Sequence, residues 1–258
     1  MKMENYRNLS IIVPTYNRYQ HLRFLLNSID KQSTYPREVI IINDCSIDQT
    51  ESFLNKWRIN KEEFNVIVYN SPENKGPAVA RNIGIQLASC DLIAFTDDDC
   101  ILSKDWVKQI QNSKLWKDEG IAGIGGKVIP YQKNLVSEYY TFHRILEPPK
   151  FIQYLVTANA CYRRDLLLEI DGFDEDHCYP GGEDNGLSFK LIRIGYRFGF
   201  EKNMIVYHNY RTSIPAFLKT FYRYGKGCAE TTIKYLKNNQ LGFQFKKNTD
   251  KMEGVIIK

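Results

Sequence analysis

The stretch Leu92-Ile-Ala-Phe-Thr-Asp-Asp-Asp-Cys100 decides the fold, because four apolar residues are followed, after Thr96, by three consecutive carboxylates. A short apolar run bounded by polar residues is typical of a strand that is buried on both faces. Three adjacent carboxylates repel one another, and a hard divalent cation with oxygen ligands would neutralise them. Because side chains alternate along an extended segment, Asp97 and Asp99 are expected to face the same way. The stretch predicts a metal site at the end of a buried strand, and the alternative is a solvated acidic loop or helix N-terminus.

Apolar runs with strand character alternate with segments of helical spacing on the N-terminal side of this stretch. The expected strands are Leu9–Val13, Val39–Ile42, Val66–Tyr69 and Leu92–Phe95. Four apolar strands separated by helices predict an α/β fold, with a mostly parallel central sheet and helices on both faces. This half of the chain is therefore expected to be Rossmann-like.

Polar clusters follow three of these strands. They are Pro14–Asn17, Asn43–Ser46 and Asp97–Asp99. In open α/β sheets, ligands bind beyond the carboxyl ends of the strands. We therefore expect the three clusters to converge in space.

The second half of the chain is less regular. The expected elements are a strand at Ile121–Ile129, a helix at Arg163–Ile170, a helix from Glu183 to about Ile194, two strands at Arg197–Phe200 and Ile205–Tyr207, and a helix from Pro215 to about Lys237. No internal repeat or low-complexity run interrupts this order.

The composition is that of an ordinary globular chain. Of 258 residues, 43% are hydrophobic and 25% are charged, which excludes a disordered or fibrous protein. The net charge of +5 is too small to indicate nucleic-acid binding by itself. The N-terminus lacks a signal-peptide apolar stretch, and no window approaches the ~18 consecutive apolar residues of a membrane span. We expect a cytoplasmic protein that binds no nucleic acid and is either soluble or attached at the inner face of the membrane.

Four further positions have both a structural and a chemical interpretation. Asp44 after a strand is typical of a turn or helix cap, and a carboxylate there can also accept from a nucleotide. Arg81 lies in a helix whose N-terminus, near Lys75, could hold phosphate. Glu183-Asp184 after two glycines favours helix capping, and a general base is the alternative. His208 at a strand end is more often structural than a metal ligand.

Six motifs recur in a fixed order that resembles the family 2 glycosyltransferases, which have the GT-A fold and use nucleotide sugars. They are Ser10–Arg18, Val39–Asp44 with Ser46 and Asp48, Gly76–Gly84, Phe95–Cys100, Gly182–Asp184 and Val206–His208. Each motif is moderately specific, so their order and spacing carry the resemblance. It implies one GT-A domain over residues 1–258, with a nucleotide-sugar-binding half (1–100), an acceptor-binding half (101–210) and a C-terminal helical extension (211–258).

The resemblance also implies a donor site. Its residues would be Pro14, Thr15, Tyr16, Asp44, Arg81, Asp97 and Asp98. Pro14, Thr15 and Tyr16 would wall the nucleotide, and Asp44 would meet the base, usually uracil. Arg81 would lie near the ribose or diphosphate.

The catalytic and metal-binding positions follow from the same resemblance. Asp184 would be the catalytic base with Glu183 beside it, while Asp97, Asp99 and His208 would surround Mn²⁺ or Mg²⁺. An imidazole ligand favours Mn²⁺. The resemblance implies a metal-dependent, inverting transfer of a hexosyl-type sugar from a nucleotide sugar, expected to be a UDP-sugar. The expected acceptor is a glycan or a lipid-linked molecule, in glycan or cell-surface polysaccharide synthesis.

Two rival functions remain from the sequence. A sugar-phosphate nucleotidyltransferase usually needs a glycine-rich basic loop after the first strand, where this chain has Pro14–Arg18. A catalytically silent nucleotide-sugar-binding module is the second rival, although every chemical position is present. The aromatic-basic stretch Phe221–Gly227 is expected to close the fold as an amphipathic helix, with acceptor or membrane contact as the alternative.

Overall fold

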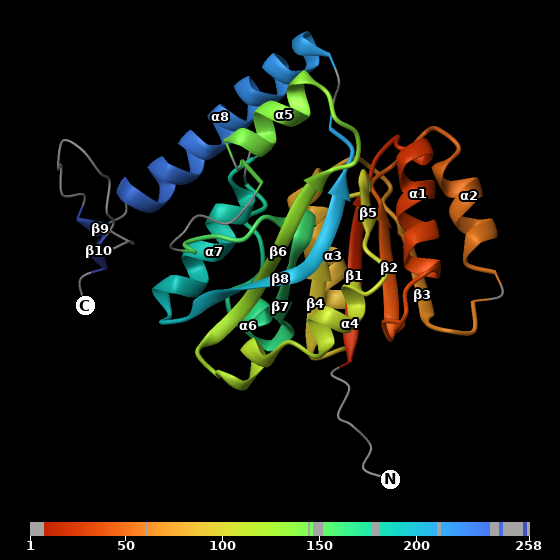
Figure 1. Ribbon diagram of the computed structural model, residues 1–258, viewed down its shortest axis with the longest axis horizontal. Coiled ribbons are helices and arrows are strands. Elements are labelled where there is room, and N and C mark those ends of the chain that lie inside the picture. Colours follow the sequence, from red (N-terminus) through yellow and green to blue (C-terminus); the bar gives the residue numbers. More distant parts are fainter. Residues whose placement is uncertain are drawn as a thin grey trace.

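The computed structural model describes residues 8–59, 61–143, 145–146, 152–176, 181–210, 213–237, 243–244 and 255–256. Within them, one eight-stranded sheet forms the centre of the molecule, in the order β3-β2-β1-β4-β7-β6-β8-β5 (Figure 1). The strands are β1 (Leu9–Thr15), β2 (Glu38–Asn43), β3 (Asn65–Asn70), β4 (Leu92–Phe95), β5 (Cys100–Leu102), β6 (Ile121–Pro130), β7 (Ala160–Arg163) and β8 (Arg197–His208). Two short strands, β9 (Phe243–Gln244) and β10 (Val255–Ile256), pair separately. Most of the predicted extension after residue 237 lies outside the described residues.

Six of the eight strands point the same way. β1 pairs in parallel with β2 and β4, and β2 pairs in parallel with β3. β7 is antiparallel to both β4 and β6, so β6 and its parallel neighbour β8 share the direction of β4. Only β7 and β5 run against the rest of this sheet. The predicted mostly parallel sheet is confirmed, and the carboxyl ends of β1, β2, β4 and β8 lie along one edge.

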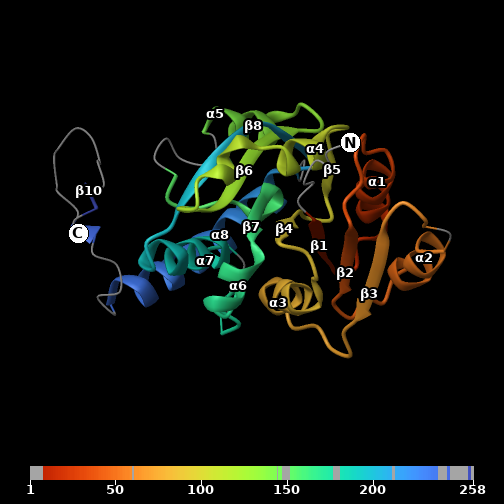
Figure 2. The same cartoon turned by 90° about the horizontal axis from the view of Figure 1, so that it is seen from below.

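Two apolar layers cover the two faces of the sheet. Along β1, Ile11 and Val13 belong to one buried cluster, while Ile12 belongs to the other, as the alternation of a strand requires. The first cluster includes residues of α1 (Tyr19–Asp30), α2 (Thr50–Trp57) and α4 (Trp106–Gln111). The second includes residues of α3 (Pro77–Leu87), α6 (Arg164–Glu169) and α7 (Glu183–Arg193). Figure 2 shows α3, α6 and α7 on the face opposite to α4.

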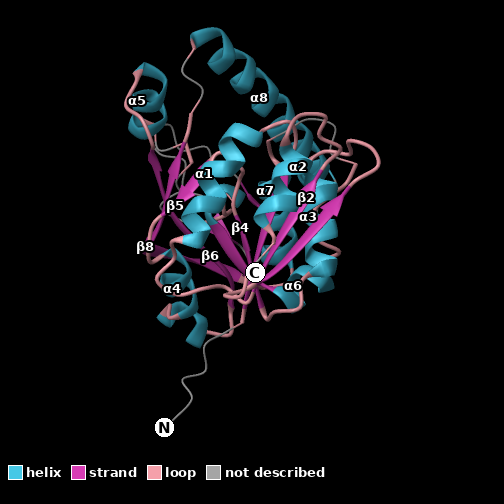
Figure 3. Ribbon diagram, turned by 90° about the vertical axis from the view of Figure 1, so that its right-hand side faces the viewer, coloured by secondary structure: helices cyan, strands magenta, loops and turns pink. Residues whose placement is uncertain are grey.

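The two remaining α-helices lie outside these two layers. α5 (Leu135–Phe142) and α8 (Ile214–Lys237) sit together beyond the carboxyl ends of the strands (Figure 3). Two single-turn 3₁₀ segments complete the described elements, at Lys114–Lys117 and Thr157–Asn159.

One expected pair of strands is a single strand. β8 runs without a break from Arg197 to His208, whereas the sequence predicts two strands separated by polar residues. Its pairing with β6 shifts register there: Gly126 faces Glu201, and the next residue, Lys127, faces Ile205. A bulge therefore absorbs the polar residues while the strand continues. From the sequence pattern alone, the polar residues of the bulge are expected to separate two strands.

Gly84 of α3 sets how closely that helix approaches the sheet. A Cβ at this position would lie 2.5 Å from Cγ2 of the fully buried Ile12. We expect Gly84→Ala to lower the free energy of unfolding by about 1–3 kcal/mol through overpacking. Gly225→Ala is the control, because nothing lies within 4 Å of a Cβ there. Urea unfolding of both variants checks this, and equal stabilities would contradict the close contact.

Candidate functional site

The three polar clusters meet at the carboxyl edge of the sheet. The Thr15 hydroxyl donates to Oδ2 of Asp98 at 2.8 Å, and the Asp44 amide donates to the carbonyl of Thr15 at 2.9 Å. The Asn17 amide donates to the hydroxyl of Ser46 at 2.9 Å. The predicted convergence is therefore confirmed.

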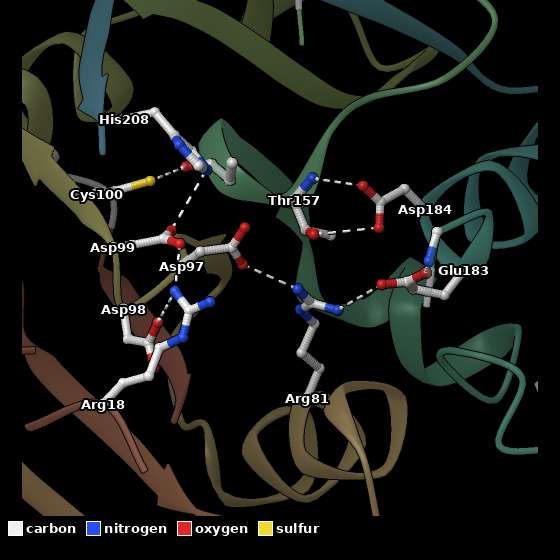
Figure 4. Close-up of polar contacts among 12 residues, drawn as sticks. Arg18, Arg81, Asp97, Asp98, Asp99, Cys100, Thr157, Glu183, Asp184 and His208 are labelled. Atoms are coloured by element: carbon white, nitrogen blue, oxygen red, sulfur yellow. Dashed lines mark hydrogen bonds and ion pairs between the residues drawn. The ribbon is translucent and has the colours of Figure 1, made fainter. Parts of the chain in front are cut away.

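The three adjacent aspartates point to different partners (Figure 4). Asp98 turns toward β1, where Thr15 and Arg18 contact it. Burial, together with the neighbouring Asp99 charge, raises the pKa of Asp98 to about 7. Asp99 faces Arg18 and His208, and Asp97 faces Arg81. Arginine side chains thus neutralise much of the repulsion that the sequence predicts for this cluster.

His208 lies beside Asp99 because of strand pairing. Its partner across β5 and β8 is Cys100, the residue after Asp99. Nε2 of His208 lies 3.3 Å from Oδ1 of Asp99. Although burial opposes this, the charges of His208 and Arg18 hold the pKa of Asp99 below its usual range.

The residues present fit a divalent cation. Oδ1 of Asp99 and Nδ1 of His208 are buried without a hydrogen-bond partner. Asp99, Cys100 and His208 place one potential ligand atom each within 4.8 Å of one another. Burial raises the pKa of the Cys100 thiol well above its usual value, and the thiol lies 3.8 Å from the Ala158 carbonyl. Carboxylate oxygen and imidazole nitrogen are the donors that suit Mn²⁺.

Asp97 departs from the expected arrangement. Its Oδ1 lies 3.0 Å from Nη2 of Arg81, and it is not part of the group formed by Asp99, Cys100 and His208. The expectation that Asp97 and Asp99 act together on one cation therefore stays a prediction.

Arg81 joins the two ends of the site. Its side chain is almost completely buried, with Nη2 on Asp97 and Nη1 3.4 Å from Oε1 of Glu183. The guanidinium also lies over the ring of Phe173 at 5.6 Å. These contacts place an arginine between the carboxylates after β4 and those at the start of α7.

Glu183 and Asp184 open α7 but point to different neighbours. Oε2 of Glu183 accepts from the Gly181 amide at 2.7 Å, and its other oxygen meets Arg81. The carboxylate of Asp184 accepts from the amide and the hydroxyl of Thr157, each at 3.1 Å. Burial, followed by the charge of Glu183, raises the pKa of Asp184 to about 7. Two adjacent carboxylates thus differ in role: one bonds a backbone amide and an arginine, and the other is held by threonine with a raised pKa.

Asp44 has the structural role that its spacing suggests. Its two carboxylate oxygens accept from the amides of Lys75 at 3.0 Å and Gly76 at 2.8 Å, just before α3. These bonds fix the start of the helix that carries Arg81. Contact between Asp44 and a nucleotide base stays a prediction.

Pro14 and Tyr16 lie at the same edge, next to Thr15. Tyr16 is 47% exposed and follows the end of β1. Pro14 is partly buried. Their role as walls of a nucleotide site stays a prediction.

Sequence reasoning missed two side chains of the site, Arg18 and Thr157. Arg18 lies in the first motif, and the need to neutralise three carboxylates was the signal that could have found it. Thr157 carries no sequence signal, because only the fold brings it to Asp184. Lys190 anchors α7 by donating to the carbonyls of Ile170 and Gly172 at 3.3 and 2.8 Å.

Comparison with known sequences identifies the family. The family model for glycosyl transferase family 2 matches residues 10–171. The chain belongs to this family. An uncharacterized glycosyltransferase of Haemophilus influenzae is 37% identical over 223 residues, covering 80% of this chain and 70% of that protein.

Two other relatives are considerably longer than this chain. The pre-mycofactocin glycosyltransferase of Mycobacterium tuberculosis is 25% identical over 247 residues, or 90% of this chain and 49% of that protein. TarS of Staphylococcus aureus, a poly(ribitol-phosphate) β-N-acetylglucosaminyltransferase, is 36% identical over 174 residues, or 63% of this chain and 28% of that protein. The chain thus spans about half the length of the first relative and less of the second.

Solved structures confirm the GT-A fold of this family 2 member. A Pyrobaculum calidifontis mannosyltransferase in complex with GDP-Man and Mn²⁺ has a TM-score of 0.73 at 21% identity, covering 90% of this chain and 65% of that chain. TarS residues 1–349 in complex with UDP give a TM-score of 0.60 at 23% identity, covering 88% of this chain and 65% of that chain.

No helix in the described part of the chain is long and apolar enough to cross a membrane.

Arg81→Met tests the buried bridge. Removing the guanidinium leaves Asp97 and Glu183 without their shared cation, so we expect a loss of about 3–5 kcal/mol in the free energy of unfolding. Arg197→Met is the control, because Arg197 pairs with Asp118 at the exposed surface, and it should change stability little. Urea unfolding measures both. A loss no larger for Arg81→Met than for the control would contradict the bridging role.

Proposed function

We propose that this chain is a metal-dependent, inverting glycosyltransferase that moves a hexosyl-type sugar from a UDP-sugar to a hydroxyl of a glycan or lipid-linked acceptor. The observation that carries the proposal is the buried Arg81, which contacts Asp97 on one side and Glu183 on the other. It links the carboxylates expected at the donor with those expected at the acceptor in a single site. Family membership supports the same reaction class.

Asp184 is the general base in this proposal. A carboxylate with a pKa of about 7 is half ionised near neutral pH and is well matched to proton abstraction there. Thr157 fixes its orientation through two hydrogen bonds. Asp184 takes the proton of the acceptor hydroxyl as that oxygen bonds to the anomeric carbon, while the bond from this carbon to the nucleoside diphosphate breaks. Attack from the face opposite to the leaving group inverts the anomeric configuration.

Asp99 and His208, with Asp97 nearby, would hold Mn²⁺ or Mg²⁺. When bound, the cation supplies positive charge that offsets the negative charge developing on the departing diphosphate. Oδ1 of Asp99 and Nδ1 of His208, which are buried without a hydrogen bond, support this assignment. The Mn²⁺ named in the structure of the mannosyltransferase neighbour supports it as well. Arg18, already beside Asp98 and Asp99, adds a further cation at the same place.

The nucleotide lies along the ends of β1 and β2 in this proposal. Pro14, Thr15 and Tyr16 form the wall of the nucleotide site. Asp44, whose carboxylate holds the segment just before α3, approaches the base. A uridine nucleotide is supported by TarS, for which structures with UDP and UDP-GlcNAc are known. The mannosyltransferase neighbour has GDP-Man, so GDP is the informative competitor.

Asp99→Ala tests the metal. We expect UDP to raise the melting temperature more with Mn²⁺ than with EDTA, because a ligand that binds only the folded state stabilises it. The variant should lose this difference, and GDP should give a smaller shift than UDP. Differential scanning fluorimetry measures the melting temperature for each protein, nucleotide and metal condition. Equal UDP shifts with Mn²⁺ and EDTA in the unmutated protein would refute metal dependence.

Asp184→Asn tests the base. General-base assistance typically contributes ~10²–10⁴-fold, so kcat should fall by about that factor while UDP affinity changes little. In the unmutated protein, the rate should drop about tenfold per pH unit below pH 7, because the base becomes protonated, and should level off above it. The readout is UDP release from the UDP-sugar that gives the largest thermal shift, with water as acceptor.

Glu183→Gln is the matched variant for this experiment. It keeps the side-chain length but weakens the pairing with Arg81, so it should reduce stability more than kcat. If Glu183→Gln loses kcat and Asp184→Asn keeps it, the base is Glu183. If UDP release is absent from the unmutated protein with every UDP-sugar, the silent binding module is the better description.

A further inference from the structure

α8 buries only one of its sides. Phe217 and Phe221 pack into a small apolar cluster with Val136, Tyr140 and Tyr210. Farther along the same side, Thr231 and Tyr235 are buried as well. This side fills the predicted role of closing the fold. Another side of α8 is exposed to solvent.

The outward side of α8 carries an apolar stripe. Ile214, Leu218 and Tyr222 recur every four residues and are 53%, 59% and 65% exposed. Four-residue spacing moves a side chain only about 40° around a helix, so these residues share one side. α5, which packs against α8 through the rings of Tyr139 and Phe217, adds Phe142 with 82% exposure. Clustered exposed apolar side chains of this kind mark an interaction site.

A basic border runs beside this stripe. Lys219, Arg223 and Lys226 are exposed and lie next to the apolar residues around the helix. Over its full length, α8 contains five Lys or Arg residues and one Glu. An apolar stripe with a basic border is typical of helices that lie in the interface of an anionic membrane. A second copy of the chain would bring the same positive border against itself, which opposes self-association.

We propose that α5 and α8 form a docking surface for an anionic lipid membrane. Both helices lie beyond the carboxyl ends of the strands, at the edge that holds the candidate site (Figures 1 and 3). Leu218, Tyr222 and Phe142 enter the acyl boundary, while the basic border meets lipid phosphates. The docking itself does not depend on the proposed function. Only the idea that docking brings a lipid-linked acceptor to the site rests on that function.

α8 also connects this surface to the carboxylates at the start of α7. The Thr231 hydroxyl donates to the carbonyl of Gly182 at 3.0 Å. Gly182 has a φ of 101°, and a Cβ there would lie 2.7 Å from the carbonyl oxygen of Gly227. Only glycine permits this approach of α8 to the residue before Glu183. Docking would therefore hold Glu183 and Asp184 close to the lipid surface.

Vesicle sedimentation of the full chain tests the docking surface. We expect binding to vesicles of phosphatidylcholine with phosphatidylglycerol, weak binding to phosphatidylcholine alone, and release at high salt. Leu218→Glu with Phe142→Glu should weaken binding at least about tenfold, since each change removes a large apolar side chain from the lipid. The variant Lys219→Gln, Arg223→Gln and Lys226→Gln keeps the apolar stripe and should weaken binding about a hundredfold.

Ile59→Glu is the matched control. Ile59 is a similarly exposed apolar residue, at 62%, and follows Arg58 at the end of α2. Figure 1 shows α2 far from α8. It should leave vesicle binding unchanged, and thermal unfolding confirms that every variant is folded. The proposal is overturned if the unmutated chain stays in solution with anionic vesicles or if the folded variants bind as the control does. It is also overturned if the chain is a dimer by light scattering that Leu218→Glu dissociates.

Discussion

Arg81 is a buried guanidinium held between Asp97 and Glu183, and the arrangement of the site depends on it. Asp97 follows the central strand β4, Arg81 lies on a helix on one face of the sheet, and Glu183 begins another helix on that face. Taking a charge out of water is costly unless opposite charges compensate it, so the three groups stabilise one another only while all are present. This constraint fixes where α3 and α7 can lie relative to the end of β4.

Opposite charges also compensate the other two carboxylates of the acidic cluster, Asp98 and Asp99. Arg18 compensates Asp98 and Asp99, while Asp98 in its buried position has a pKa near 7. His208 reaches Asp99 from β8. Two arginines and a histidine therefore hold three adjacent carboxylates in a fixed arrangement.

α8 has a buried side and an outward side that differ in their surroundings. Its buried side packs on α5 and on the segment before α7, where Gly182 allows the close approach that Thr231 completes. Its outward side remains apolar with a basic border. A helix that only closed the fold would gain nothing from exposing Leu218 and Tyr222, whose hydration is unfavourable. The helix thus links a surface of the molecule to the carboxylates of the candidate site.

The sequence alone determined the alternation of strands and helices and the convergence of its polar clusters, because apolar periodicity and turn residues are local signals. Thr15, Asp44 and Asp98 could be placed at one edge from the rule that parallel strands end together. Only the tertiary structure decided the partners of each charge. Arg81 meets Asp97 and Glu183, Thr157 meets Asp184, and β8 continues through polar residues, since these outcomes depend on long-range pairing and burial. No local pattern carries that information, because the groups come from distant segments that only the folded sheet brings together.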